Sequence, residues 1–392
     1  MLLRVKKNTL IWLLGMYVTL ALTLPYEWRI GILSYIFSAS LASLIIIPIY
    51  FLCHVKSGLM KIYLLYNFVL LLSTYINGIP IKEQMTLSLM GVSLVGAFEL
   101  INKFGSIKQY KIYTFYFSAL VIINSLQTIY YGSSRNESGY LCIFGNKNWY
   151  LYRILPAIFL ILLYLAKQKK NIFSLYLAVV WSMAMISVMI AGSGAGTLVL
   201  LLWGIYIVLI PFVKKIKQNE KFDNYIVYML IILFVFLVIV VWNAAEIFAP
   251  IIVGLLGKDL TFTTRTRIWT RAIELISKKP FIGYGVMESN DVVSLFYGIP
   301  DFTTTHNQYL GELFRGGIPL LAIFICLIIT SFRGLQRSNN IDIKKTMSYG
   351  IFCLLLWWMM ESITSMYLVL VLFICYHLPE NSKDESKVIQ NG

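Results

Sequence analysis

Two stretches of the sequence carry side chains that could bind an anion and move a proton. Residues 264–279 contain Arg265 and Arg267, and residues 303–319 contain His306. Guanidinium groups bind phosphate through paired hydrogen bonds, and a neutral imidazole can accept the proton of a hydroxyl group. Together these residue types could bind a phosphate group and accept a proton.

The stretch 264–279 has the periodicity of an amphipathic helix that ends before Pro280. Its expected apolar stripe consists of Ile268, Trp269, Ala272, Ile273 and Ile276. Arg265 and Arg267 fall in the first turn, where free N–H groups and guanidinium groups together make a good phosphate site. The alternative is a helix at the membrane surface whose arginines contact lipid headgroups. The sequence leaves both interpretations open.

His306 is one of only three histidines in the chain. Thr305 is the expected N-cap of the next helix, which would place His306 and Asn307 in its first turn. A helix N-terminus disfavours positive charge, so we expect the imidazole to stay neutral and able to accept a proton. A lone histidine is more often structural than catalytic, so the assignment depends on the surroundings of His306.

The connector 132–149 contributes further polar residues. Asn148 lies at its end, and Arg153 lies one turn into the helix that follows. Arg153 could bind an anion or extend its charge to lipid headgroups. Asn148 could support the same site or only cap the helix.

The elements that must position these residues are membrane-spanning helices. The 392-residue chain is 59% hydrophobic and 13% charged, whereas soluble domains carry about 25% charged residues. Its apolar residues fall in blocks of about 20, the length of helix that crosses a bilayer. This composition excludes a soluble enzyme, a disordered chain and a fibrous protein. We expect an all-α polytopic membrane protein with twelve spans, over residues 8–25, 30–53, 59–77, 85–101, 112–131, 150–166, 171–190, 194–213, 225–247, 307–331, 345–360 and 362–378.

The positive charges orient these helices. The net charge is +15, which in a soluble protein would suggest a nucleic-acid partner, but here the cations lie in short connectors. With a cytoplasmic N-terminus, 21 of the 33 Lys and Arg residues fall in the cytoplasm, so both termini are expected there. Because the orientation of the helices explains these charges, no nucleic-acid partner is expected. The expected parts are nine helices in residues 1–247, a large external loop in 248–306, three helices in 307–378 and a cytoplasmic tail in 379–392.

Several motifs are absent from the sequence. It contains no glycine-rich phosphate loop, no His-Glu-x-x-His and no Asp-x-Asp, so neither a metal nor another cofactor is expected. The five cysteines show no zinc or disulfide spacing. Ionisable residues inside the spans are few, which weakens the case for an ion-coupled transporter.

Short motifs in this order resemble the O-antigen ligase and polysaccharide polymerase superfamily. They are Arg267-Ile-Trp269, Pro280-Phe-Ile-Gly283-Tyr-Gly285, His306-Asn307-Gln-Tyr-Leu310 and Gly317-Ile-Pro-Leu, together with the connector Gly145-Asn-Lys-Asn148. The motifs around the external loop cover about residues 264–320, and the layout of spans matches over most of the chain.

The resemblance implies a metal-independent glycosyltransferase whose donor is an undecaprenyl-diphosphate-linked oligosaccharide at the outer face of the bacterial plasma membrane. Arg267 would bind the diphosphate, and His306 would be the base for the acceptor hydroxyl. We add Arg265 and Arg153 to the diphosphate site from their positions. The supporting residues would be Asn307, Trp269 and Asn148. The partners it implies are the lipid-linked substrate and membrane lipid. It also allows a chain-length regulator and a flippase as partners.

Two departures from the family pattern favour a polymerase over a ligase. The turn Ser193-Gly194-Ala195 lacks an arginine that ligases often have, and Arg315 stands where an acidic residue is common. The alternatives are an O-antigen ligase, which transfers the finished polymer to another acceptor, and a flippase for lipid-linked oligosaccharides. A passive channel or an assembly scaffold would need neither the arginines nor His306.

Overall fold

The structure of the chain is a computed structural model. It describes residues 2–25, 28, 36, 38–132, 135–136, 139–216, 225–242, 263–299, 302–363 and 365–378. The parts of the predicted spans and of the external loop that fall between these ranges, and the predicted tail 379–392, lie outside the described residues.

The described residues form an almost entirely helical protein with one two-stranded antiparallel pair, β1 with β2. The α-helices are α1 (Leu2–Thr23), α3 (Ala39–Leu52), α4 (Gly58–Ile76), α5 (Lys82–Phe104), α6 (Ile107–Tyr131), α7 (Tyr150–Lys167), α8 (Leu175–Ile190), α9 (Gly194–Ile216), α10 (Tyr225–Phe236), α11 (Thr263–Lys278), α12 (Ser289–Leu295), α13 (Gln308–Gln336), α14 (Ile341–Trp358) and α15 (Met366–Tyr376). The shorter elements are β1 (Arg135–Asn136), β2 (Gly139–Tyr140), the 3₁₀-helix η2 (Lys147–Trp149) and the π-helix η4 (Leu237–Val241).

Each of the twelve predicted spans overlaps with one of these helices. Helices are required here because backbone N–H and C=O groups in a bilayer must bind one another within the segment. Within the described residues, five helical stretches are long and apolar enough to cross a membrane: Gly58–Ile76, Lys82–Phe104, Ile107–Tyr131, Lys147–Lys167 and Gln308–Gln336. The chain is therefore a helical membrane protein, and the count of twelve crossings stays a prediction.

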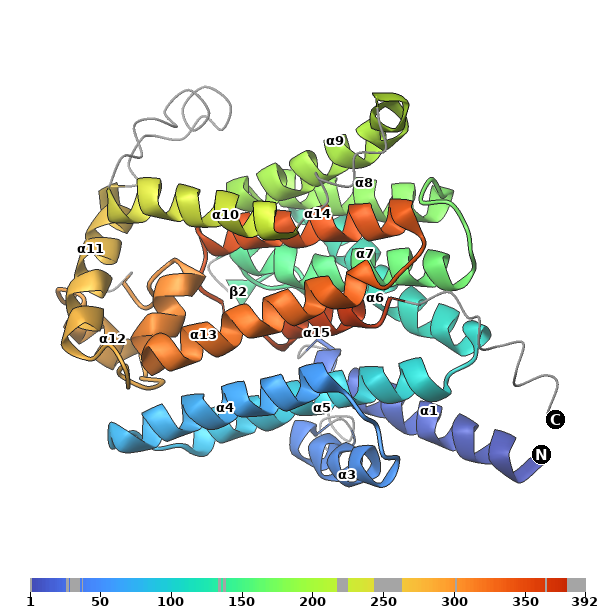
Figure 1. Cartoon of the computed structure of the whole chain (residues 1–392), viewed down its shortest axis with the longest axis horizontal. Coiled ribbons are helices and arrows are strands. Elements are labelled where there is room, and N and C mark those ends of the chain that lie inside the picture. The colour runs from blue at the N-terminus through green and yellow to red at the C-terminus, as the bar shows by residue number, and fades with distance from the viewer. Residues whose placement is uncertain are drawn as a thin grey trace.

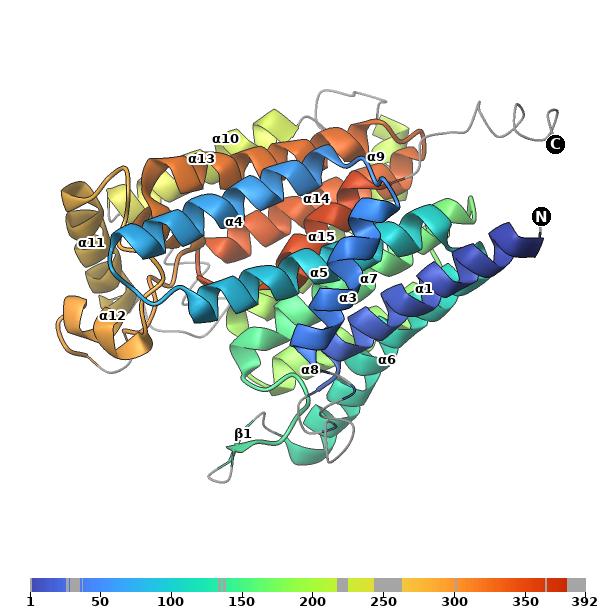
Figure 2. The ribbon, with the colours of Figure 1, turned by 90° about the horizontal axis from the view of Figure 1, so that it is seen from below.

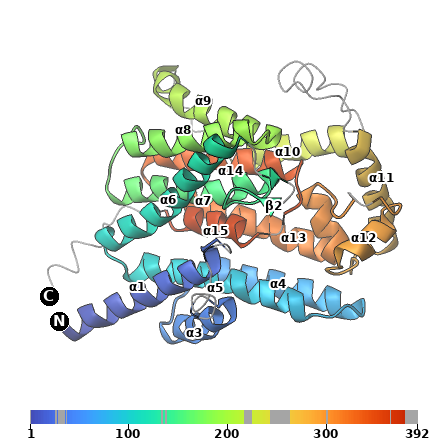
Figure 3. The ribbon, with the colours of Figure 1, turned by 180° about the vertical axis from the view of Figure 1, so that it is seen from behind.

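The long helices run in one general direction, with α11 and α12 at one end of the bundle and the N-terminal end of α1 at the other (Figure 1). Helix α7 occupies the centre, and every side chain from residue 154 to 165 is buried. Helices α6, α8, α14 and α15 surround it, and Figure 3 shows α6, α8 and α9 on the far side of the bundle. On the near side α4 and α13 lie next to each other, as Figure 2 shows from below.

This arrangement gives a direct test of the predicted topology. A reporter fused after residue 290, in α12, should be outside the cytoplasm, and one fused after residue 340, before α14, should be inside. A fusion after Gly105, between α5 and α6, is the matched cytoplasmic control. A cytoplasmic signal from the fusion at 290 would contradict the external position of the whole site.

Candidate functional site

Helix α13 is broken close to the end that faces α11. Gly317 has φ 67° and ψ −165°, which lies outside any helical conformation. In a regular helix the carbonyls of Phe314 and Arg315 would accept hydrogen bonds from the N–H groups four residues later. Ile318 donates its N–H outside the helix, and Pro319 has no N–H to donate. Both carbonyls are therefore available to another segment.

The turn 280–285 is that segment. Three backbone hydrogen bonds join it to the break in α13: Tyr284 N to Phe314 O at 2.7 Å, Gly285 N to Arg315 O at 2.9 Å and Ile318 N to Pro280 O at 2.8 Å. The Pro-x-x-Gly-x-Gly motif and the Gly-Ile-Pro motif of the sequence thus form one interface. The two motifs are separate in the sequence, and each supplies one side of this interface.

Two glycines are required at this interface for steric reasons. Gly283 and Gly317 have φ angles of 69° and 67°, in the region that side chains disfavour. A Cβ atom on Gly283 would lie 2.7 Å from the carbonyl carbon of Arg315, and one on Gly317 would lie 2.5 Å from that of Phe281. Backbone atoms cannot move away cheaply, so the turn approaches α13 this closely only with glycine.

Helix α4 holds the other side of the same turn. Ser73 Oγ lies within hydrogen-bonding distance of the carbonyls of Ile282 and Arg315, at 2.5 and 2.6 Å. Asn77 donates its side-chain amide to the carbonyl of Gly283 at 3.1 Å. The turn is therefore clamped between α4 and α13, which fixes the position of α11 immediately before it.

His306 lies just before α13 and not in its first turn. The N-cap of α13 is Asn307, whose side chain accepts a hydrogen bond from Leu310 N, so the predicted N-cap at Thr305 is wrong. Thr305 instead donates its hydroxyl to the carbonyl of Asn307 at 2.8 Å. His306 has φ 46°, a left-handed conformation that costs about 1–3 kcal/mol for such a residue. The sequence predicts a place in the first turn that would keep the imidazole neutral. Because His306 lies outside that turn, this reason for a neutral imidazole no longer applies.

A carboxylate faces the imidazole of His306, and a guanidinium group binds the other oxygen of that carboxylate. Its Nδ1 lies 3.8 Å from Oε2 of Glu361, in the turn between α14 and α15. The other carboxylate oxygen, Oε1, lies 3.1 Å from Nη2 of Arg265 in α11. The side chains of Arg265 and His306 are 27% and 26% exposed, but that of Glu361 is only 8% exposed. Three segments therefore meet at Glu361.

Neighbouring hydrogen bonds fix the turn that carries Glu361. Asn307 donates its side-chain amide to Met359 O at 3.1 Å, and Gln308 accepts from Ile363 N at 2.9 Å. Asn307, predicted as a supporting residue, thus joins the start of α13 to the end of α14 while it caps α13. Its side chain is fully buried, so its role here is in the framework.

Helix α11 confirms the amphipathic prediction with one exception. Its buried residues are Ile268, Trp269, Ala272 and Leu275, whereas Ile273 is 38% exposed. The predicted stripe is therefore wrong at Ile273, because the buried face turns towards α13 and α12 and includes Leu275. Trp269 is 1% exposed and belongs to this small core. Protein covers this apolar face, and the assignment of the arginines to a phosphate rather than to lipid headgroups stays a prediction.

Arg267 lies on a different side of α11 from Arg265. Residues two apart on a helix do not share a face. The guanidinium of Arg267 is exposed, lies 6.0 Å from the centre of the Tyr297 ring and has no acidic partner among the described residues. Arg271 covers the same ring at 5.3 Å, but it also binds Glu274 at 2.6 Å and Leu295 O at 2.9 Å. The hydrogen bond from Arg271 lowers the pKa of Glu274.

The connector residues lie on another part of the bundle. Arg153 donates to Ile143 O at 3.0 Å and packs against the rings of Phe144, Tyr152 and Tyr367. Asn148 lies in η2, where its backbone N–H is bound by the side chain of the N-cap Asn146. No described contact joins Arg153 or Asn148 to His306, so their part in one diphosphate site stays a prediction.

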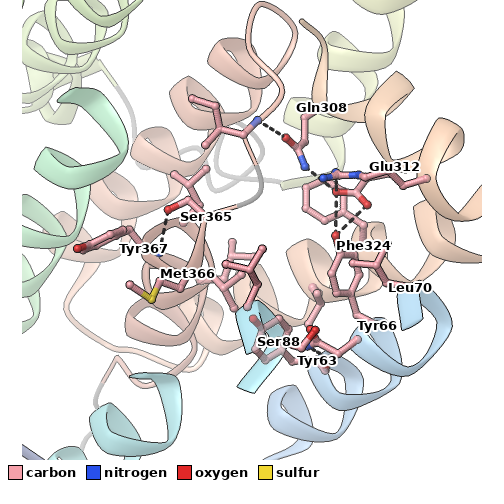
Figure 4. A pocket seen from close by; sticks show the side chains of 18 of the residues that line it. Tyr63, Tyr66, Leu70, Ser88, Gln308, Glu312, Phe324, Ser365, Met366 and Tyr367 are labelled. Carbon is pink, nitrogen blue, oxygen red and sulfur yellow. Dashed lines mark hydrogen bonds and ion pairs between the residues drawn. The ribbon is translucent and has the colours of Figure 1, made fainter. Parts of the chain in front are cut away.

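A cavity of about 320 Å³ lies among helices α4, α5, α13 and α15, in which α4 and α15 each contact both α5 and α13. One wall is polar: Glu312 is fully buried and accepts hydrogen bonds from Tyr66 at 2.9 Å, Gln308 at 2.6 Å and Arg315 at 2.9 Å. Figure 4 shows Tyr66, Gln308 and Glu312 of this wall beside the aromatic and aliphatic side chains that line the rest. Phe324, Leu327 and Leu372 make part of the apolar lining.

The cavity lies next to the His306 cluster, by which we mean Arg265, His306 and Glu361. Gln308 belongs to the cavity lining and binds Ile363, two residues after Glu361. Tyr152 and Tyr367 also line the cavity, and both rings contact Arg153. An anion or an amphipathic ligand in the cavity would therefore lie near several cations.

Two acidic groups of this region have only weak signals in the sequence. Glu361 is an acidic residue at a turn that is predicted to be external, in a chain that has only 18 acidic residues. Glu312 and Arg315 are three apart, which places them on one helical face, but their burial against Tyr66 depends on contacts across 246 residues. Among the described residues no three His, Cys, Asp or Glu side chains gather as a metal-ligand set.

Comparison with known proteins supports the resemblance noted in the sequence. Residues 177–325 match a family model described as O-antigen ligase. The match supports the O-antigen ligase and polymerase superfamily and includes α11, the turn 280–285, His306 and the break in α13. No curated protein matches the sequence significantly.

Proposed function

We propose that the protein is a membrane glycosyltransferase that polymerises undecaprenyl-diphosphate-linked oligosaccharide repeat units into O-antigen or capsular polysaccharide. The reaction would take place at the outer face of a bacterial plasma membrane, with both termini in the cytoplasm. The family match supports an enzyme of the O-antigen ligase and polymerase type. The choice of polymerase rests on the sequence departures at Gly194 and Arg315.

One observation carries the proposal most directly. His306 and the arginine helix α11 converge at one end of the bundle, where Arg265 and His306 both contact Glu361. This end also holds a cavity with a polar wall and an apolar lining. Such a place suits a lipid that carries sugars on a diphosphate, because the polar and apolar parts of the substrate each find a matching surface.

The proposed step is a single displacement at the anomeric carbon of the donor sugar. The oxygen of the acceptor hydroxyl forms the new glycosidic bond, and its proton passes to the imidazole of His306. The bond between the anomeric carbon and the phosphate oxygen breaks, and the electron pair leaves with the diphosphate. Arg267 stabilises the negative charge that develops on the leaving group. Attack from the opposite side inverts the anomeric centre.

The two alternatives predict different products. A ligase would join an existing polymer to a second acceptor, and a flippase would move lipid-linked units without any new glycosidic bond. A flippase has no use for a base at the outer face. The family match does not favour it.

The decisive test uses purified protein in lipid nanodiscs with lipid-linked repeat units as the only substrate and EDTA in the buffer. We expect a ladder of longer products, because guanidinium groups can provide the electrostatic stabilisation that a cation provides elsewhere. Gel or mass analysis of the products measures it. The same reaction with added Mg²⁺ is the control and should proceed at a similar rate.

Three outcomes contradict parts of this proposal. Activity that EDTA removes and a divalent ion restores would refute the metal-independent step. Product formation only after a second acceptor is supplied would identify a ligase. Movement of the substrate across the bilayer without any new bond would identify a flippase.

A further inference from the structure

We infer that Glu361 is the positioning residue for His306, and that the main role of Arg265 is to bind Glu361 rather than the diphosphate. The inference deepens the proposed function and rests on His306 acting as the base. It starts from the order of contacts at the His306 cluster: Arg265 to one oxygen of Glu361 and His306 to the other.

The geometry explains why the imidazole should be oriented through Nδ1. This nitrogen is buried and has no hydrogen-bond partner among the described residues, although it faces the Glu361 carboxylate. The separation of 3.8 Å is longer than a hydrogen bond. Such contacts in catalytic sites often shorten when substrate binds. A small rotation of either side chain would let Nδ1–H donate to Oε2.

This hydrogen bond would decide which ring nitrogen can act as a base. A neutral imidazole carries one proton, and the carboxylate can only accept. With the proton on Nδ1, the other nitrogen, Nε2, keeps its lone pair and can take the proton of the acceptor hydroxyl. The carboxylate also stabilises the imidazolium that forms, as in other sites where an acidic group lies behind a catalytic histidine.

Arg265 has a defined part in this arrangement. A carboxylate that is 8% exposed is costly to keep charged without a partner. Arg265 supplies that partner at 3.1 Å and also donates to the carbonyl of Met360, so its guanidinium is held from two sides. These contacts commit Arg265 to Glu361, which leaves Arg267 as the arginine of α11 without an acidic partner among the described residues.

The backbone supports the same conclusion. His306 keeps a left-handed φ of 46° while the side chains of the next two residues form hydrogen bonds, Asn307 to Met359 O and Gln308 to Ile363 N. These two bonds hold the turn of Glu361 against the strained residue from both sides. A strained residue over-determined by its surroundings is typical of a functional site.

The test is the substitution Glu361→Gln, which keeps the shape of the side chain and removes its charge. Arg265 can only donate, so the oxygen of the new side-chain amide should stay towards Arg265 and its NH₂ group should face His306. The imidazole would then have to accept at Nδ1 and carry its proton on Nε2, where it cannot act as a base. We expect kcat to fall between about tenfold and 10⁴-fold, with the KM for the lipid-linked donor changed by less than about twofold, because Glu361 is not placed against substrate.

Two further measurements separate positioning from a structural effect. In the His306→Asn background, Glu361→Gln should lower kcat by less than about a further twofold, because the effects of two residues that act as a unit are not additive. Independently of activity, ¹⁵N-histidine NMR of the three-histidine protein should show the His306 proton on Nδ1 in the native chain and on Nε2 in Glu361→Gln. The signal is assigned as the one that His306→Asn removes.

The outcomes are distinguishable from a failure of the proposed function. An unchanged kcat in Glu361→Gln, an equal loss in both backgrounds, or an unchanged tautomer in the NMR experiment would each overturn the positioning role. Full activity of His306→Asn alone would instead remove His306 as the base. A fall in kcat with the tautomer change, absent in the His306→Asn background, supports the inference.

Discussion

The substitution His306→Asn is expected to lower the rate of polymerisation by about 10²–10⁴-fold, the usual contribution of a general base. Asparagine tolerates left-handed backbone conformations better than most residues, so it should preserve the φ of 46° at this position while it removes the base. The measurement is the ladder of products from purified protein and, in cells, the accumulation of single lipid-linked repeat units at the outer face.

His54 offers a matched control for this variant. It is also a histidine in a left-handed conformation, with φ 47°, and it lies in the connector between α3 and α4. The substitution His54→Asn therefore makes the same chemical change on a similar backbone, and activity should stay within about twofold of the native rate. Repeat units stranded on the cytoplasmic side in His306→Asn would indicate a flippase. Full polymerisation would reduce His306 to a structural residue before the cap of α13.

The substitution Arg267→Ala is expected to lower polymerisation by at least about 10²-fold, the cost of removing one group that stabilises developing charge. Arg267→Lys should lose less than Arg267→Ala, because lysine keeps the charge but not the paired hydrogen bonds of a guanidinium group. Protein amount and insertion into the membrane should be unchanged, since the side chain is exposed. Product ladders from equal amounts of purified protein measure the difference.

Arg271 is the control for this experiment. It lies one turn further along α11 and covers the same Tyr297 ring, but its charge is already bound by Glu274. Arg271→Ala should therefore retain activity within a few-fold of the native protein. Equal losses in Arg267→Ala and Arg271→Ala would point to a shared effect on Tyr297 or the loop. Normal polymer from Arg267→Ala would exclude this arginine from the diphosphate site.

The helices are predictable from the sequence because membrane helices depend mainly on local composition. Each predicted span has its helix, and α11 begins at Thr263 and ends at Lys278, close to the predicted 264–279. The two glycine motifs are visible in the sequence, but their joint interface is not. Periodicity cannot show that the carbonyls of Phe314 and Arg315 lack hydrogen bonds within the helix, because this follows from the conformation of Gly317.

The predictions are wrong where a contact joins distant segments. Thr305 and Asn307 are both good N-caps, and the sequence cannot tell which of them begins the helix. The structure selects Asn307, which also binds Met359 O. The predicted role of Arg265 at the diphosphate stays a prediction, and the sequence gives no sign of its acidic partner Glu361, 96 residues later in the chain. Local patterns place charges on helices, and tertiary packing decides their partners.

The clamp on the turn 280–285 also sets the order in which the protein can be completed during synthesis. Ser73, which binds the carbonyl of Ile282, is made 209 residues before it. The N–H groups of Tyr284 and Gly285, in contrast, bind carbonyls of α13 that the ribosome has not yet made when the turn emerges. A nascent chain can therefore rest this turn on α4 but cannot fix it, and Glu361 arrives later still. The candidate site is therefore assembled among the last steps of insertion, and incomplete chains lack it.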